Sequence, residues 1–343
     1  MVLTIDLDGA QVLLLLLNRV QKGDIPTDSE LQSVLATNKF FVDFYCQWEG
    51  VNLESLIETI CRFNQPEWKP SVSVLSALAR GFQRAVEEND LLQTKLNFLK
   101  AVDTSPIVDH VLNHLPHDTP SQSTIHVTID GFNGGFQYQG EMGLSLLGDI
   151  TKPALFEAGV AHELHHVGFM YWVERDPIRQ AVLKEQSGRA IAVRHVQNLL
   201  SEGLAIFYCS PYQIRADEAM GTFGTKLANY RREESHLFAQ AESVLATSLN
   251  PHADFSMCLE AFEVMALDPD GILPMAHYLG ARMVEVMSQF HPKERIIECV
   301  RSLSGFLPMY NQAAQKTNAF VYNPSIVEQF SQIWDFKGRD AGC

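Results

Sequence analysis

An apolar stretch near the middle of the chain contains three histidines and a glutamate: Gly159-Val160-Ala161-His162-Glu163-Leu164-His165-His166-Val167-Gly168-Phe169-Met170. It lies within a longer apolar run from Ala154 to about Val173. Pro153 precedes the run and suits a first helical turn, because its fixed φ matches the helix and its missing N–H is not needed there. The polar segment 174–177 follows the run and ends in a proline, which cannot continue a helix interior. The sequence therefore predicts one long, largely apolar helix over 154–173.

Two histidines of this helix are spaced so that their rings share one face. His162 and His166 are four residues apart, which places them about 40° apart around a helix, so both imidazoles can converge on one ion. Glu163 is the next residue around the helix and can reach a water on that ion without binding the ion itself. This spacing predicts zinc ligation with a carboxylate general base. His165 lies about 100° from His166, and we expect it to be structural.

A hydrogen-bonded polar patch at a helix interface is the alternative explanation for these side chains. Burying two imidazoles and a carboxylate in an apolar helix is costly unless each group has a partner. A catalytic zinc site instead has three protein ligands and keeps one position open for water. The metal hypothesis therefore requires a third ligand elsewhere in the chain.

The third ligand does not follow the metzincin pattern. That pattern places a glycine and a third histidine three and six residues after the second histidine, where this chain has Phe169 and Trp172. The better candidate is Glu202, which lies in a second apolar helix predicted from Arg189 to Tyr208. The alternative is an ordinary surface glutamate, which the apolar character of this helix disfavours.

The residues next to Glu202 are small. Gly203 and Ala205 would let their helix approach another closely, and we expect this approach to bring Glu202 to the metal. His195 lies two turns earlier on the same face and is the second candidate for the third ligand. A supporting or core role suits His195 better than ligation.

The rest of the chain is predicted to be mainly helical, with one β segment. A polar breaker at 119–124 suggests a boundary between an N-terminal helical region, 1–120, and a second region, 121–343, although both can belong to one compact unit. Apolar residues alternate over 125–130, which is typical of a strand, and the glycine-rich segment 131–135 suggests a turn. We expect an antiparallel hairpin over 123–148. Helical spacing predicts the remaining helices at about 13–20, 53–61, 74–82, 90–99, 256–267, 273–289, 293–304, 307–316 and 324–334.

The composition and charge of the chain indicate which classes of partner and which cellular compartment suit it. The chain has 343 residues and a net charge of −15, so it would repel phosphate backbones and nucleic acid is an unsuitable partner. The apolar run Val12–Leu17 is too short to span a bilayer, and we expect no membrane segment. Its six cysteines are scattered and form no C-x-x-C pair, which favours a reduced, cytoplasmic protein.

At these residues the chain resembles the gluzincins, which carry His-Glu-x-x-His on one helix and a ligand glutamate on the next. The resemblance implies a zincin-like, mainly α (α+β) fold with a small antiparallel hairpin or sheet beside the active helix. It also implies Zn²⁺ bound by His162, His166 and Glu202, with Glu163 as the base, and a hairpin edge against which an extended peptide or protein substrate lies.

More narrowly, the chain is similar to an uncharacterised bacterial group of proposed zinc-dependent peptidases. That similarity covers about residues 120–317 and includes the later segments Tyr278-Leu279-Gly280 and Tyr310-Asn311. The chain departs from thermolysin-like enzymes in its longer spacing between His166 and Glu202. Ile206 also stands where those enzymes have an aspartate, so the carboxylate that would support a ligand is missing.

These residues suggest zinc-dependent hydrolysis of peptide bonds. Glu163 would take the proton of the attacking water and deliver it to the leaving amine. Tyr278 and His277 are candidates for donors to the oxyanion, although either can be a packing residue of its helix. The alternatives are a zinc amidohydrolase that does not cleave peptides, a catalytically inactive metal-binding module, and a helical scaffold in which the motif is accidental.

Overall fold

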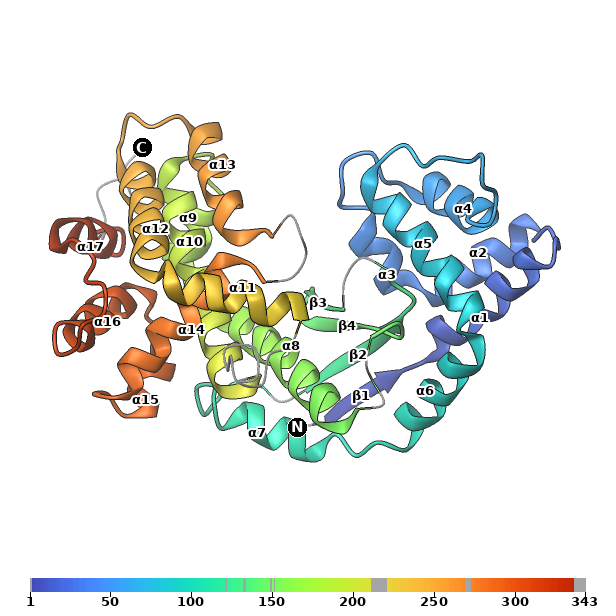
Figure 1. The fold of residues 1–343 in the computed structure, drawn as a ribbon, viewed down its shortest axis with the longest axis horizontal. Coiled ribbons are helices and arrows are strands. Elements are labelled where there is room, and N and C mark those ends of the chain that lie inside the picture. The colour runs from blue at the N-terminus through green and yellow to red at the C-terminus, as the bar shows by residue number, and fades with distance from the viewer. Residues whose placement is uncertain are drawn as a thin grey trace. The chain divides into compact units, whose positions relative to one another are not determined.

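The computed structural model describes residues 2–120, 122–131, 134–148, 150, 152–210, 221–268 and 273–335, and Figure 1 labels its elements. The chain divides into two compact units, residues 1–109 with 121–167 and residues 110–120 with 168–343. Phe132 and Asn133 of the expected turn lie outside the described residues. The division into domains at 1–120 and 121–343 stays a prediction.

The first unit contains one small mixed sheet. Its strands run in the order β1-β2-β4-β3: β1 (Val2–Asp6), β2 (Gln122–Thr128), β4 (Glu141–Ser145) and β3 (Gly135–Tyr138). β2 is parallel to both β1 and β4, whereas β3 and β4 form an antiparallel hairpin. Gln139 and Gly140 turn this hairpin with φ of 50° and 80°, the positive values that a tight two-residue turn requires. An antiparallel hairpin is therefore present within 123–148, but it turns at Gln139 and Gly140 and not at 131–135. The strand expected to be its first arm, β2, pairs with β4 in parallel instead. β3 is an edge strand.

β1 is a strand that the sequence did not predict. It pairs in parallel register with β2, from Val2 opposite Gln122 to Asp6 opposite His126. His126 reinforces the pairing, because its Nδ1 lies 3.1 Å from a carboxylate oxygen of Asp6. This partner is about 120 residues away along the chain, so local periodicity carries no signal for it.

Helices make up the remainder of the first unit. The apolar stripe of α1 faces inward as its spacing predicts, since Leu13, Leu16, Leu17 and Val20 are all buried. α1 contacts α2, α4, α5 and β2. The helices that lie within this unit are α1 (Asp8–Gln21), α2 (Asp28–Thr37), α3 (Lys39–Tyr45), α4 (Leu53–Arg62), α5 (Ser73–Glu87) and α6 (Asn89–Ala101).

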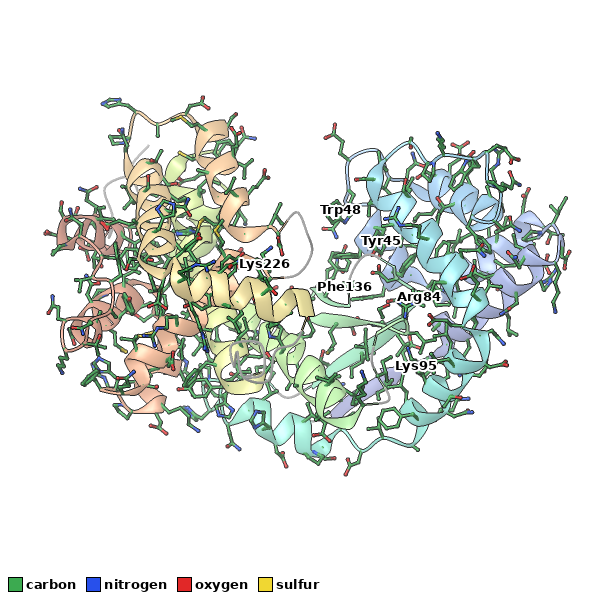
Figure 2. All side chains as sticks on the ribbon, in the orientation of Figure 1. Tyr45, Trp48, Arg84, Lys95, Phe136 and Lys226 are labelled. Atoms are coloured by element: carbon green, nitrogen blue, oxygen red, sulfur yellow. The ribbon has the colours of Figure 1, made fainter. Side chains whose placement is uncertain are left out.

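Aromatic stacking fastens α3 to the β3–β4 hairpin. Phe136 of β3 stacks on Phe44 with ring centroids 3.9 Å apart and on Phe40 at 5.6 Å. Its ring crosses Gly143 of β4, where an added Cβ would lie 2.3 Å from the ring. Tyr45 donates a hydrogen bond to the Asp130 carboxylate, and Figure 2 labels Tyr45 and Phe136. These contacts hold the edge strand in place.

The second unit is helical around one apolar core. α10 and α14 make the most extensive helix pair in it. Its elements are the end of α7 (Ser105–Leu112) and the end of α8 (Pro153–Val173), then α9 (Pro177–Leu183), α10 (Gly188–Leu204), the π-helix η1 (Ala205–Cys209), α11 (Gly221–Arg232), α12 (Glu234–Leu249), α13 (Phe255–Ala266), α14 (Met275–Ser288), α15 (Lys293–Glu298), the 3₁₀-helix η3 (Leu303–Gly305), α16 (Phe306–Ala314) and α17 (Pro324–Ser331).

α8 matches the predicted long helix to within one residue. Its interior is apolar apart from the histidine motif, and its residues Val160, Leu164 and Phe169 are buried. Among the residues that the structure describes, no helix combines the length and the apolar character needed to cross a membrane.

Candidate metal centre

The two motif histidines of α8 face each other. The Nε2 atoms of His162 and His166 lie 3.0 Å apart, and their rings are nearly perpendicular, with centroids 4.6 Å apart. Two nitrogens that bind one tetrahedral zinc at 2.0–2.1 Å are separated by about 3.3 Å. The His162 side chain is buried, at 7% exposed. Spacing on one helical turn therefore brings the two nitrogens to nearly the separation that a shared cation requires.

Glu202 of α10 completes a group that can hold a metal ion. One ligand atom from each of His162, His166 and Glu202 lies within 4.8 Å of the others, and all three residues are buried or half-buried. Two imidazole nitrogens and one carboxylate oxygen are a donor set of catalytic zinc sites, which leave the fourth position open. The structure thus brings together the three residues that the sequence singled out.

A close crossing of two helices holds Glu202. A Cβ added to Gly203 would lie 2.4 Å from the carbonyl oxygen of Gly280 on α14, so the two backbones touch at this point. The small residue expected to permit a close approach does so, and its partner is α14. The crossing places His277, one turn before Gly280, with its Nε2 3.2 Å from a carboxylate oxygen of Glu202.

His277 therefore contacts the candidate ligand itself. The two groups form an ion pair when the imidazole is protonated, and a neighbour this close to a coordinating carboxylate helps to set its direction. The sequence offered His277 as an oxyanion donor, and this second role stays a prediction. The sequence did not predict the contact between His277 and Glu202, because this contact depends on how α10 and α14 cross.

Tyr278 follows His277 on α14 but is directed elsewhere. Its hydroxyl donates to the Glu234 carboxylate at 2.5 Å, and Arg282 Nε lies 3.1 Å from the same carboxylate. Tyr278 is only 3% exposed. Burial and the bond to Glu234 raise the pKa of its hydroxyl. A role for Tyr278 as oxyanion donor stays a prediction, and it requires the hydroxyl to leave Glu234.

Glu163 lies against the start of the edge strand β3. A Cβ added to Gly135 would meet Glu163 Cγ at 2.9 Å and Oε1 at 3.0 Å. Only glycine fits this position without displacing the carboxylate. The sequence predicted that Gly135 belongs to a turn, and no local pattern indicated its contact with Glu163.

The two other histidines considered from the sequence, His165 and His195, are buried outside the metal group. His165 is fully buried and lies outside the metal group. His195 is also fully buried, beside Phe262 with ring centroids 6.3 Å apart. Desolvation lowers the pKa of His195 to about 4. His195 is thus a neutral core residue, as its position on α10 suggested.

The later resemblance segment at Tyr310 and Asn311 supports the core. The Asn311 side chain donates to the Tyr322 carbonyl at 2.8 Å and accepts from the Tyr322 N–H at 2.9 Å. The Tyr310 hydroxyl donates to the Phe320 carbonyl at 2.8 Å. Both side chains thus anchor the segment after α16, and neither belongs to the metal group.

Comparison with known proteins identifies a family. A family model described as "Putative zinc dependent peptidase (DUF5700)" matches residues 35–319, which is most of the chain. No curated protein and no solved structure matches the chain. The matched segment contains the whole candidate metal group, His162, His166 and Glu202. The chain belongs to this family, DUF5700.

Proposed function

We propose that this chain hydrolyses peptide bonds, with His162, His166 and Glu202 as zinc ligands and Glu163 as the general base. The observation that carries the proposal is the pair of Nε2 atoms 3.0 Å apart, grouped with the Glu202 carboxylate. Glu163 follows His162 directly in the same helix. A site that only stabilised the fold would need no carboxylate next to its ligands.

Each residue has a distinct task in the proposed reaction. Zinc, when bound, supplies a Lewis acid that polarises a carbonyl and lowers the pKa of water. Glu163 accepts a proton from the attacking water and delivers it to the leaving amine, so one carboxylate serves both transfers. His277 holds the Glu202 carboxylate, from which its Nε2 is 3.2 Å away.

The edge strand β3 is the proposed place for the substrate. Among the described residues, β3 pairs with β4 along one edge only. An extended peptide can add to such an edge through backbone hydrogen bonds, which accept many side chains. Because Gly135 of β3 touches Glu163, a peptide along this edge would pass beside the base.

Replacement of Glu163 tests the proposal. Glu163→Gln keeps the size of the side chain and removes its ability to accept a proton, so we expect zinc to stay bound and turnover to fall by about 10²-fold or more. The matched control is Glu157→Gln, because Glu157 is an exposed glutamate of the same helix. Cleavage is measured over a peptide library, with and without chelator.

Two outcomes would overturn the proposal. If Glu163→Gln cleaves as fast as the parent chain, Glu163 is not the base. If the zinc-loaded parent cleaves no peptide in the library but hydrolyses simple amides, the peptidase assignment is wrong and the amidohydrolase alternative replaces it.

A further inference from the structure

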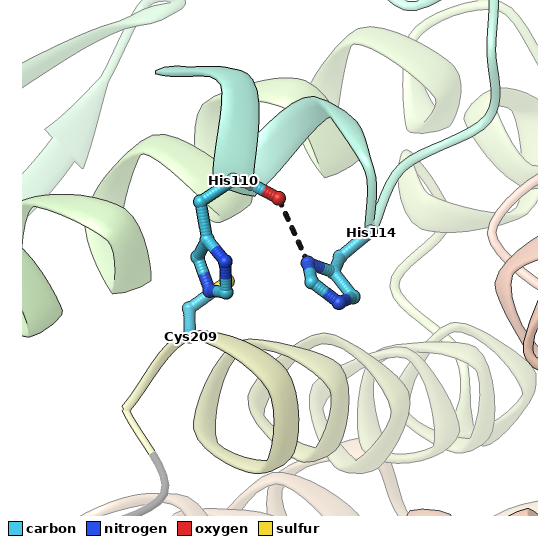
Figure 3. A group of neighbouring side chains, drawn as sticks. All are labelled: His110, His114 and Cys209. Carbon is cyan, nitrogen blue, oxygen red and sulfur yellow. Dashed lines mark hydrogen bonds between the residues drawn. The ribbon is translucent and has the colours of Figure 1, made fainter. Parts of the chain in front are cut away.

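A second group of residues that could hold a metal ion shares no member with the first. It consists of His110 on α7, His114 just beyond the end of α7, and Cys209, the last residue of η1. One ligand atom from each lies within 4.8 Å of the others. All three belong to the second unit, and Figure 3 shows the two histidines above Cys209.

Backbone carbonyls fix the protonation of both imidazoles. His110 Nε2 lies 2.9 Å from the Tyr208 carbonyl oxygen, and His114 Nδ1 lies 2.8 Å from the His110 carbonyl oxygen, a contact drawn in Figure 3. A carbonyl only accepts, so these ring nitrogens must carry the protons. In the neutral rings the coordinating lone pairs then belong to Nδ1 of His110 and Nε2 of His114. Metal-binding histidines in proteins are oriented by this type of bond.

Tyr208 contacts both histidines of the group. Its carbonyl accepts from His110, and its ring stacks on the His114 ring with centroids 4.6 Å apart and planes 22° apart. The next residue along the chain is Cys209. One dipeptide at the end of η1 thus orients both imidazoles and supplies the sulfur.

We propose that His110, His114 and Cys209 bind a divalent cation of the zinc type. Two imidazole nitrogens with one thiolate are a donor set for zinc, whereas calcium and magnesium prefer oxygen ligands. A cation here would tie α7 to η1. η1 continues directly from α10, the helix that carries Glu202. The site is therefore distinct from the proposed catalytic centre and is connected to it through one helix.

Cys209 does not have the surroundings of a catalytic thiol. It is only 4% exposed. Reactive cysteines are accessible and have lowered pKa values. His110, in contrast, is exposed, which leaves a route for an ion from solvent to the group.

Cobalt substitution in the full chain tests this site. The first site is weakened by His162→Ala, and Co²⁺ is then added while the near-ultraviolet thiolate-to-cobalt charge-transfer band is recorded. We expect the band to saturate at about one cobalt per chain. The His162, His166 and Glu202 group contains no sulfur and cannot produce it, so this result does not depend on the peptidase proposal.

Three further variants identify the ligands. Cys209→Ala and His110→Ala should each abolish the band at that cobalt level. His110 is exposed, so its variant is a safeguard if loss of the buried Cys209 disturbs folding. Cys299→Ala is the matched control, because Cys299 is a free thiol that is equally buried, at 3% exposed. It should retain the band.

The proposal fails if His162→Ala shows no thiolate band with cobalt in excess. It also fails if the band survives in Cys209→Ala or in His110→Ala, or if Cys299→Ala removes it. Each of these results would mean that Cys209 and its two histidines are packing and surface residues.

Discussion

Substitution of Gly203 by alanine tests the helix crossing that positions Glu202. The new Cβ would lie 2.4 Å from the Gly280 carbonyl oxygen and 2.6 Å from the carbonyl carbon. Both atoms are backbone, so no side chain can rotate away and α10 and α14 must separate. Overpacking of this kind costs about 3 kcal/mol. The better helix propensity of alanine returns about 1 kcal/mol, which leaves a net loss of about 2 kcal/mol in the free energy of unfolding.

Gly159→Ala is the matched control for this variant. Gly159 is also helical, but a Cβ added there meets no atom within 4 Å. Its variant should therefore gain up to about 1 kcal/mol from propensity alone. Urea unfolding followed by circular dichroism, in the presence of chelator, compares the two without a contribution from metal binding. We expect the variants to differ by about 3 kcal/mol, with opposite signs relative to the parent.

The same variant links packing to the metal. Separation of α10 from α14 would move Glu202 away from His277, so Gly203→Ala should also bind zinc more weakly than the parent. The reasoning is refuted if Gly203→Ala unfolds at the same urea concentration as Gly159→Ala. In that case the contact between the Gly203 and Gly280 backbones does not constrain the two helices.

The remaining predictions concern the ligands and pH. Glu202→Ala should lower zinc occupancy in metal analysis, and unchanged occupancy would require a different third ligand. His277→Ala should weaken zinc affinity by about 10- to 100-fold in a chelator competition, because the Glu202 carboxylate loses its partner; exposed His236 supplies the control variant, and equal affinity in both would exclude the positioning role. The pKa of His195 is about 4 in the folded chain and about 6.5 in the unfolded chain. Between these pH values the unfolded chain therefore binds more protons than the folded chain. As a result, the free energy of unfolding should fall as the pH drops from about 6.5 to 4. His195→Gln should flatten that decline in urea unfolding, and an identical pH profile would refute it.

Local periodicity predicted the elements that depend on neighbouring residues. The helix predicted over 154–173 is α8 at Pro153–Val173, and the C-terminal helices predicted at about 256–267 and 324–334 are α13 at Phe255–Ala266 and α17 at Pro324–Ser331. The apolar faces of these segments repeat within a few turns, so the pattern is visible in the sequence alone.

Elements that depend on distant partners were not predictable in this way. The five residues of β1 become a strand by pairing with β2 about 120 residues later. The helix predicted over 189–208 is divided into α10 and the π-helix η1, and no local signal marked that change.

The candidate site shows the same contrast. His162, Glu163 and His166 are within one helical turn, so their spacing alone predicted a shared face. Glu202 was chosen from its apolar surroundings, and the structure adds the crossing at Gly203 and the contact with His277. The approach of Gly135 to Glu163, and that of Cys209 to His110, join segments distant in sequence and had no local signal.

Anomalous scattering at the zinc absorption edge, measured on crystals grown with zinc, shows whether His162, His166 and Glu202 bind one ion. We expect a peak about 2.0–2.1 Å from Nε2 of both His162 and His166, with a Glu202 oxygen about 2.0–2.2 Å from it. A map with no peak at the two imidazoles, or a peak there while the Glu202 carboxylate points away from it, would refute the proposed zinc site.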